Sequence, residues 1–503
     1  MSRTRRLAAV AAIAVAVVSC TRMVDGDPKL AIPKVGAPIA WDHCVAASPG
    51  KNSILANARC GKLGVPVDYS TRDAGAASLA VIKFPATGPR IGSLVINPGG
   101  PGESGLNAAA SMYQNLPQPL KERFDLVGFD PRGVGFSKPE VWCNSDADND
   151  RQRADPQVDY SPAGIAHIEQ TTKEFVQRCV DKMGKEFLAN VGTATVAKDL
   201  DMLRAALGDQ KLTYLGYSYG TRIGSTYAEQ YPQNVRAMVL DGAIDPNADP
   251  FEADIRQAEA FQKAFDDYAR DCAKSANCPL GDDPAKAVDV YHGLVDPLVD
   301  KPAPTADPRG LSYPDAIVGT ILPLYSPTLW PNLTAALTEL VNGHGDKMLA
   351  LADQYMERDA KGRYSNSTDV RSAVNCVDRP PITDRAKAAE QDRQLREVAP
   401  FMSYGQFTGY APLGTCAFWP VPPTTVPHQI SVRDLAPVLV ISTTGDPATP
   451  YQAGVRLADQ LHGALLTFDG TQHTVALEGH SCVDDIVTRY LIDLTLPAPG
   501  ARC

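Results

Sequence analysis

Short apolar runs alternate with amphipathic stretches along much of the chain, which is the pattern of a parallel sheet covered by helices. Residues 212–215 predict a buried strand, 221–231 a helix that ends before Pro232, and 235–242 a second strand. A strand, a helix and a strand in this order form a right-handed crossover unit. Further elements are a helix at 193–207 and core strands at 93–97, 125–130, 437–442 and 464–468.

Other parts of the chain depart from this alternation. Residues 41–92 predict short antiparallel strands, such as 64–69 and 79–84, and the polar residues 140–165 predict a surface excursion. Between about 246 and 400 the strands stop, and helices are predicted at 258–276, 285–298, 313–320 and 333–355. The predicted organisation is a signal segment at 1–19, a tether at 20–40, a core at 41–245, an inserted helical lid at 246–400 and the remaining core at 401–503.

The sequence Gly-Tyr-Ser-Tyr-Gly at 216–220 directly follows one predicted strand and precedes a predicted helix. In a nucleophile elbow, a strand turns sharply into a helix, and the serine at the tip is exposed between glycines that let the backbone pass closely. Five residues alone are a weak signal, because ordinary turns also produce them. The flanking elements supply the context that an α/β-hydrolase fold requires, so Ser218 is the candidate nucleophile.

In this fold an acid and then a histidine follow the serine along the chain. Asp446 lies in the turn after the predicted strand 437–442, at the edge of the sheet where catalytic groups gather. The alternative is an Asp that only forms the turn before Pro447.

His473 follows the predicted strand 464–468 and is the candidate base. His480 is the rival, but it stands where the last helix is predicted to start, as a surface or capping residue.

These three residues predict acyl transfer. His473 would take the proton from Ser218, and Asp446 would orient the imidazole and stabilise its protonated form. The backbone N–H of Tyr219 is one predicted oxyanion donor. The other is the N–H of Gly100, or failing that Gly99, in the Gly/Pro-rich loop after strand 93–97. A plain turn is the alternative for this loop.

Several motifs together resemble one family, the actinobacterial tripeptidyl aminopeptidases, which are relatives of the prolyl iminopeptidases. The motifs are NPGGPGESG at 97–105, GFDPRGVGFS at 128–137, GYSYGT at 216–221 and GDPATP at 445–450. With its N-terminal segment, the chain looks most similar to the mycobacterial cell-envelope serine proteases, also described as carboxylesterases. The resemblance covers about residues 41–503 and implies a triad of Ser218, Asp446 and His473 under a lid. Asn97 stands where the iminopeptidases have His, which favours the tripeptidyl branch.

The N-terminus predicts export. Three arginines precede the apolar run 7–18, which is too short to span a bilayer as a resident helix. Val-Val-Ser-Cys at 17–20 resembles a lipobox and would make Cys20 the lipidated first residue of a protein anchored on the outer face of the plasma membrane. Ordinary cleavage and release is the alternative.

The ten other cysteines, an even number, fit an exported protein with disulfides. Nearest-neighbour pairing predicts Cys44–Cys60, Cys143–Cys179, Cys272–Cys278, Cys376–Cys416 and Cys482–Cys503.

Composition narrows the function further. The net charge of −10 disfavours a general nucleic-acid binder, and no metal or cofactor is expected, because Cys and His are not clustered at ligand spacing. The predicted function is an exported serine peptidase of the tripeptidyl type or a limited envelope protease. The alternatives are a carboxylesterase or lipase acting on envelope esters and a catalytically silent binding protein. Peptide selectivity needs an acid for the substrate's ammonium, and the candidates are Glu252, Asp254 and, preferred, Asp378.

Overall fold

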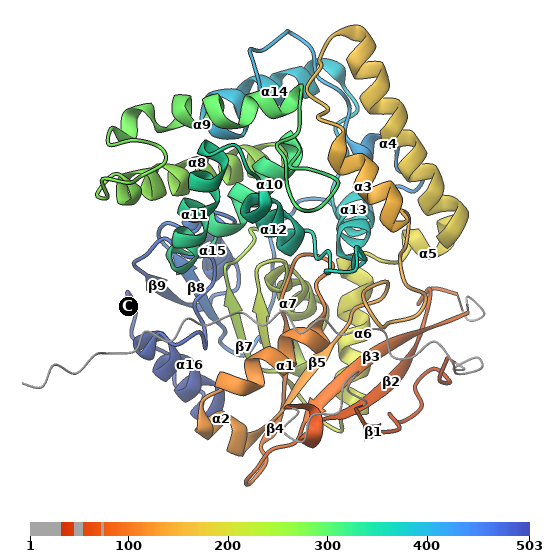
Figure 1. Cartoon of the computed structure of the whole chain (residues 1–503). Helices are drawn as coiled ribbons and strands as arrows, with labels where there is room; N and C mark the ends of the chain where they lie inside the picture. Colours follow the sequence, from red (N-terminus) through yellow and green to blue (C-terminus); the bar gives the residue numbers. More distant parts are fainter. Residues whose placement is uncertain (1–31, 45–53, 72–74) are drawn as a thin grey trace, which may run out of the picture.

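A mostly parallel sheet forms the centre of the protein, in a computed structural model that describes residues 32–44, 54–71 and 75–503 (Figure 1). The strands are β1 Asp42–His43, β2 Arg59–Pro66, β3 Ala76–Phe84, β4 Gly92–Asn97, β5 Phe124–Phe129, β6 Leu212–Tyr217, β7 Val235–Asp241, β8 Leu439–Thr443 and β9 Ala464–Phe468. Within the described residues they form one nine-stranded sheet in the order β1-β2-β3-β5-β4-β6-β7-β8-β9. The pairs β1–β2, β2–β3 and β3–β5 are antiparallel, and the five pairs from β5 through β4 to β9 are parallel. The predicted α/β class is confirmed.

Helices cover both faces of the sheet, because its central strands carry apolar residues on both sides. Leu94 and Ile96 pack with one set of helices, and Val95 between them packs with the other. The first set is α1 Gly105–Asn115, α2 Gln118–Arg123 and α16 Ser481–Asp493, and the second is α6 Thr193–Ala206, α7 Tyr219–Gln230 and α15 Tyr451–Gln460. Each fully buried aliphatic side chain contributes about 1.5–3 kcal/mol relative to an exposed one.

A layer of helices between β7 and β8 lies over the carboxyl ends of the parallel strands (Figure 1). Many of its buried residues, from Phe261 to Phe401, form a separate apolar cluster. The helices are α8 Pro250–Cys272, α9 Ala287–Val295, α10 Tyr313–Leu324, α11 Trp330–Val341, α12 Asp346–Tyr355, α13 Ser367–Asp378 and α14 Arg385–Val398. Two helices from earlier in the chain, α3 Asp146–Ala154 and α4 Pro162–Met183, lie in the same region.

Two local predictions are corrected. The single helix predicted at 333–355 is two helices, α11 and α12, because the chain turns at Gly343, whose φ of +83° ends the first helix. The polar segment 140–165 is not only a surface excursion, since Arg153 in α3 is 6% exposed and its Nε lies 2.6 Å from Asp315 in α10. The pattern of charges could not show this, because the partner lies 162 residues away in the chain.

The disulfides and the surface agree with the sequence analysis. The five predicted pairs are present: Cys44–Cys60, Cys143–Cys179, Cys272–Cys278, Cys376–Cys416 and Cys482–Cys503.

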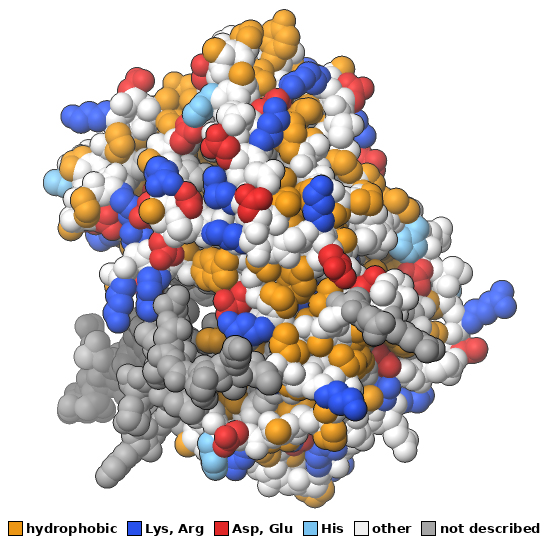
Figure 2. All heavy atoms as spheres, turned by 90° about the vertical axis from the view of Figure 1, so that its right-hand side faces the viewer, with side chains coloured by type: hydrophobic (Ala, Val, Ile, Leu, Met, Phe, Trp, Pro, Cys, Tyr) orange, Lys and Arg blue, Asp and Glu red, His pale blue; other side chains and the backbone are white. Residues whose placement is uncertain are grey.

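Figure 2 shows basic and acidic side chains intermixed on one face of the molecule rather than gathered in a patch of one sign. A face with mixed charges does not favour the binding of a polyanion such as a nucleic acid.

Arg132, in the motif at 128–137, fixes the connection after β5. Its guanidinium is fully buried and forms two hydrogen bonds with Asp199 in α6, from Nε (2.7 Å) and Nη2 (2.6 Å). The remaining donors reach the carbonyl oxygens of Pro66, Val67 and Asn190. This motif therefore ties the end of β2, the connection after β5 and α6 together.

We expect Asp199→Ala to lower the free energy of unfolding by about 3–5 kcal/mol, because it leaves the Arg132 guanidinium buried without its counter-ion. Urea denaturation followed by circular dichroism measures this change. Asp271→Ala, which breaks the exposed pair with Lys274, is the matched control and should change stability by less than about 1 kcal/mol. Equal effects of the two substitutions would contradict this structural role of Arg132.

Candidate active site

Ser218 lies at the tip of a strained turn between β6 and α7. Its φ is +52° and its ψ is −123°, a conformation that costs a non-glycine residue about 1–3 kcal/mol unless its surroundings hold it. Its N–H donates to the carbonyl of Asp241 (2.9 Å), and its carbonyl accepts from the N–H (2.9 Å) and hydroxyl (2.6 Å) of Thr221. The predicted elbow geometry is therefore present, and the side chain of Ser218 lines a large cleft between the core and the helical layer.

The loop after β4 packs tightly against this elbow. A Cβ on Gly99 would lie 2.9 Å from the Cβ of Ser218, and a Cβ on Gly220 would lie 2.7 Å from the carbonyl oxygen of Asn97. Only glycine allows both approaches, since such contacts are far inside van der Waals separation. The close packing brings the candidate oxyanion loop beside the candidate nucleophile.

His473 lines the same cleft, and Asp446 lies behind it. The Nδ1 of His473 lies 2.9 Å and 3.0 Å from the two carboxylate oxygens of Asp446. Asp446 is 2% exposed, follows β8, and also accepts hydrogen bonds from the N–H groups of Ala448 and Thr449 at 2.8 Å and from the Thr449 hydroxyl at 2.9 Å. The carboxylate is thus fixed by its own turn, and its second function is to orient the imidazole.

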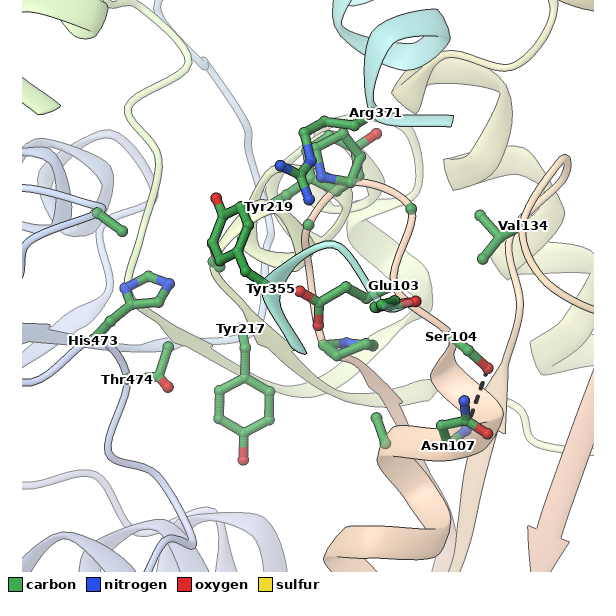
Figure 3. A pocket seen from close by; sticks show the side chains of 18 of the residues that line it. Glu103, Ser104, Asn107, Val134, Tyr217, Tyr219, Tyr355, Arg371, His473 and Thr474 are labelled. Carbon is green, nitrogen blue, oxygen red and sulfur yellow. Dashed lines mark hydrogen bonds between the residues drawn. The ribbon is translucent and has the colours of Figure 1, made fainter. Parts of the chain in front are cut away.

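The imidazole of His473 is also held by the helical layer. Its backbone N–H donates to the carbonyl of Tyr325 (2.9 Å), at the end of α10, and the two rings meet edge to face with centroids 5.4 Å apart. Burial opposes protonation of this imidazole, but the Asp446 carboxylate outweighs it, so the pKa of His473 is raised. Since Nδ1 faces Asp446, Nε2 is the nitrogen left to exchange a proton in the cleft (Figure 3).

The rival histidine lies elsewhere. His480 precedes α16, where its Nε2 lies 3.3 Å from the side-chain oxygen of Gln472 and its ring packs on Phe468. The structure therefore brings His473, rather than His480, to Asp446.

The oxyanion candidates can be separated by their hydrogen bonds. The N–H of Gly99 donates to the side-chain oxygen of Asn97 (3.0 Å), so it is already engaged. Tyr219 is the first residue of α7, where a backbone N–H has no intrahelical acceptor. The geometry favours the N–H groups of Tyr219 and Gly100 over that of Gly99.

The structure counts against the role predicted for Asp378. Its side chain is fully buried and accepts hydrogen bonds from the N–H (2.8 Å) and hydroxyl of Thr193 and from the hydroxyl of Tyr219 (3.3 Å). The Nε of Arg222 lies 4.0 Å away. Its charge is therefore satisfied by the protein, and Asp378 supports the elbow helix instead of presenting a free carboxylate to a substrate.

Sequence reasoning missed a different carboxylate, that of Glu103, which lines the cleft together with Ser218 and His473. Glu103 is exposed to the cleft, but the surrounding walls partly desolvate its carboxylate, and this desolvation and the like charge of Glu357 raise its pKa to about 7, while Arg371 and His473 act in the opposite direction. One sequence feature could have pointed to Glu103: it lies in the Gly/Pro-rich loop that follows a core strand. Such loops carry the functional groups of open α/β sheets.

Comparison with known proteins agrees with this geometry. The family model described as alpha/beta hydrolase fold matches residues 92–480. The chain belongs to the α/β-hydrolase family. It is 66% identical to the Serine protease Hip1 of Mycobacterium tuberculosis, an alignment that covers 99% of this chain and 96% of that protein. It is 53% identical to Carboxylesterase B of the same species (93% and 91% covered) and 31% identical to the Tripeptidyl aminopeptidase of Streptomyces lividans (93% and 87% covered). The family resemblance drawn from the motifs is confirmed.

The raised pKa of His473 predicts the acid limb of the activity profile. A general base must be neutral, so kcat/KM should fall as the pH drops through an apparent pKa above about 6.5, the ordinary value for histidine. Asp446→Asn should move this limb to lower pH and reduce activity by orders of magnitude. The pH dependence of kcat/KM for an activated ester measures both effects, and an unchanged limb in the variant would contradict the pairing.

Asp378→Ala should lower the melting temperature and reduce peptide and ester hydrolysis to the same extent. The reason is that it leaves Thr193 and Tyr219 without their buried acceptor. Differential scanning fluorimetry and kcat/KM for both substrate types test this expectation. A selective loss for free-amino peptides, with unchanged melting temperature, would restore the predicted substrate-binding role.

Proposed function

We propose that the protein is an exported serine peptidase that cleaves peptide bonds through an acyl-enzyme at Ser218. The observation that carries this proposal is the pairing of His473 Nδ1 with Asp446 at 2.9 Å in the cleft that also holds Ser218 on its strained turn. The order serine, acid, histidine along the chain is that of the α/β hydrolases.

In the proposed mechanism, the Nε2 of His473 takes the proton of the Ser218 hydroxyl as its oxygen attacks the substrate carbonyl. Asp446 keeps the tautomer with Nδ1–H and stabilises the imidazolium that forms. The imidazolium then protonates the leaving amine, and a water molecule activated by the same histidine releases the acyl group. The N–H groups of Tyr219 and Gly100 bind the oxyanion, and each such donor contributes roughly 3 kcal/mol to transition-state stabilisation.

Peptides are the favoured substrates because the relative at 66% identity is a serine protease. A carboxylesterase acting on envelope esters is the second candidate, because another relative, whose alignment covers 93% of this chain, is named Carboxylesterase B. The triad chemistry itself is common to both bonds, so the surrounding cleft must make the choice.

Export and lipid anchoring at Cys20 belong to the same proposal. The signal segment 1–19, Cys20 and most of the tether lie outside the described residues, and only 32–40 of the tether is described. Support comes from the apolar run 7–18 after three arginines and from five disulfides, which persist in oxidising compartments. Among the described residues, no helix is both long and apolar enough to cross a bilayer.

Labelling and substrate comparison test the proposed function together. Wild-type protein should be labelled by a fluorophosphonate and should hydrolyse a tripeptide amide, whereas Ser218→Ala should lose labelling and at least about 10³-fold of kcat/KM, because no other group replaces the nucleophile. Hydrolysis of a short p-nitrophenyl ester, with no cleavage of any peptide, would favour the esterase. Labelling that persists in Ser218→Ala would show that another residue is the nucleophile.

A further inference from the structure

The backbone directly after His473 is strained. The segment 473–477, which we call the base loop, lies between β9 and α16. In it Thr474 has a φ of +62° and Leu477 a φ of +59°, and a positive φ is especially unfavourable for a β-branched residue such as threonine. Such strain persists only where the surrounding structure holds the chain in place. The base loop therefore depends on contacts from neighbouring elements.

Asp241, at the end of β7, holds the base loop with its side chain. One oxygen of its carboxylate accepts the N–H groups of Val475 and Ala476, each at 2.7 Å, and the residue is fully buried. The backbone carbonyl of the same residue accepts the N–H of Ser218 at 2.9 Å. Asp241 is therefore hydrogen-bonded both to the turn of the candidate nucleophile and to the loop of the candidate base.

Tyr217, the residue before Ser218, provides a second connection to the base loop. Its hydroxyl donates to the carbonyl of Ala476 at 2.7 Å. In Figure 3 this hydroxyl points away from the cavity. The N–H and the carbonyl of Ala476 are thus both bound by side chains from the ends of neighbouring strands, β6 and β7.

Gly242 allows the imidazole to lie close to the end of β7. Its φ is +66°, and a Cβ at this position would lie 3.1 Å from the Cε1 of His473 and 3.0 Å from the Cγ2 of Thr474. A side chain here would be strained and would press on the imidazole. The imidazole of His473 therefore packs against the residue that follows Asp241.

We propose that Asp241 and Tyr217 are positioning residues that set the place of His473 relative to Ser218. This inference rests on the proposed acyl-enzyme mechanism, and it concerns residues outside the candidate triad. Asp446 orients the imidazole through Nδ1, whereas Asp241 and Tyr217 fix the backbone that follows it. Proton transfer requires the two atoms within hydrogen-bond reach, and a displacement of about 1 Å can reduce a rate by roughly 10²-fold.

The carboxylate of Asp241 also supplies charge. Its second oxygen is buried and has no hydrogen-bond partner among the residues that the structure describes. An amide oxygen could accept the same two N–H groups, so these hydrogen bonds alone do not require an acid. The titratable groups around His473 are those of Asp446, Asp241, Glu478, Glu103 and, from the helical layer, Tyr325. Asp241 is the acid among them that also binds the Ser218 turn and the base loop.

Three variants separate position from charge. Tyr217→Phe removes one hydrogen bond and no charge, Asp241→Asn removes the charge but keeps an acceptor oxygen, and Asp241→Ala removes both. The measurements are kcat and KM for p-nitrophenyl acetate as a function of pH, and the rate of labelling by a fluorophosphonate. Tyr291→Phe is the matched control, because it removes a buried hydroxyl that contacts Thr320 at 2.9 Å within the helical layer.

The expected result is a loss of kcat without a change in KM. Tyr217→Phe should lose about 3- to 10-fold, as expected for one hydrogen bond, and Asp241→Ala about 100-fold. Labelling rates should fall by the same factors. Asp241→Asn should move the acid limb of kcat/KM to lower pH, because removing a negative charge lowers the pKa of His473, whereas Tyr217→Phe should leave the limb in place.

Melting temperatures separate positioning from a purely structural role. Tyr217→Phe and Tyr291→Phe should lower the melting temperature to a similar extent, since each removes one buried hydroxyl. Tyr291→Phe should keep the wild-type kcat. Equal losses of kcat in these two variants would overturn the inference, because activity would then follow stability alone.

The remaining outcomes distinguish this inference from the proposed function. Wild-type kcat and labelling rates in Tyr217→Phe, together with an unmoved acid limb in Asp241→Asn, would overturn the inference and leave the proposed function standing; these two variants decide the question even if Asp241→Ala does not fold. Labelling and hydrolysis that persist in Ser218→Ala would overturn both. Cleavage of esters but of no peptide would overturn the proposed peptidase alone, since the same base serves both reactions.

Discussion

The strained backbone at Ser218 is the constraint on which the site depends. A positive φ at a serine persists only when the surroundings determine it, and here two strands and two glycine contacts do so. The Ser218 N–H is tied to Asp241 at the end of β7, while Gly99 and Gly220 let the β4 loop close against the turn. The same contacts that hold Ser218 also bring the candidate oxyanion donors beside it, so one set of packing contacts positions both the candidate nucleophile and the groups proposed to bind the oxyanion.

The helical layer contacts the proposed base as well as covering the cleft. Tyr325 at the end of α10 accepts the backbone N–H of His473 and packs on its ring, so the position of the imidazole depends on where that helix ends. Asp446, in contrast, is fixed by the turn after β8. Asp446 is therefore held by the core, whereas His473 contacts both the core and the helical layer.

The sheet and the triad candidates could be predicted because their signals are local. Apolar runs mark the buried strands, and Ser218, Asp446 and His473 each follow one of them. Asp378 was assigned a wrong environment because its partners Thr193 and Tyr219 lie 185 and 159 residues away in the chain. Glu103 was missed for the complementary reason: a carboxylate in a Gly/Pro-rich loop is ordinarily only solvated, and the folded chain is needed to show that it lines the cleft with Ser218 and His473.

Acids around His473 connect stability with catalysis. Asp241 accepts the N–H groups of Val475 and Ala476 at 2.7 Å each, which holds the loop after His473, and burial raises its pKa to about 6. Partial desolvation in the cleft and the like charge of Asp241 raise the pKa of Glu478 to about 7, and both acids raise the pKa of His473. Negative charge at these positions would stabilise the imidazolium that forms in the proposed mechanism, when His473 takes the proton of Ser218. Asp241 therefore has two effects at once: it fixes the loop after His473 through two backbone N–H groups, and its charge raises the pKa of the proposed base.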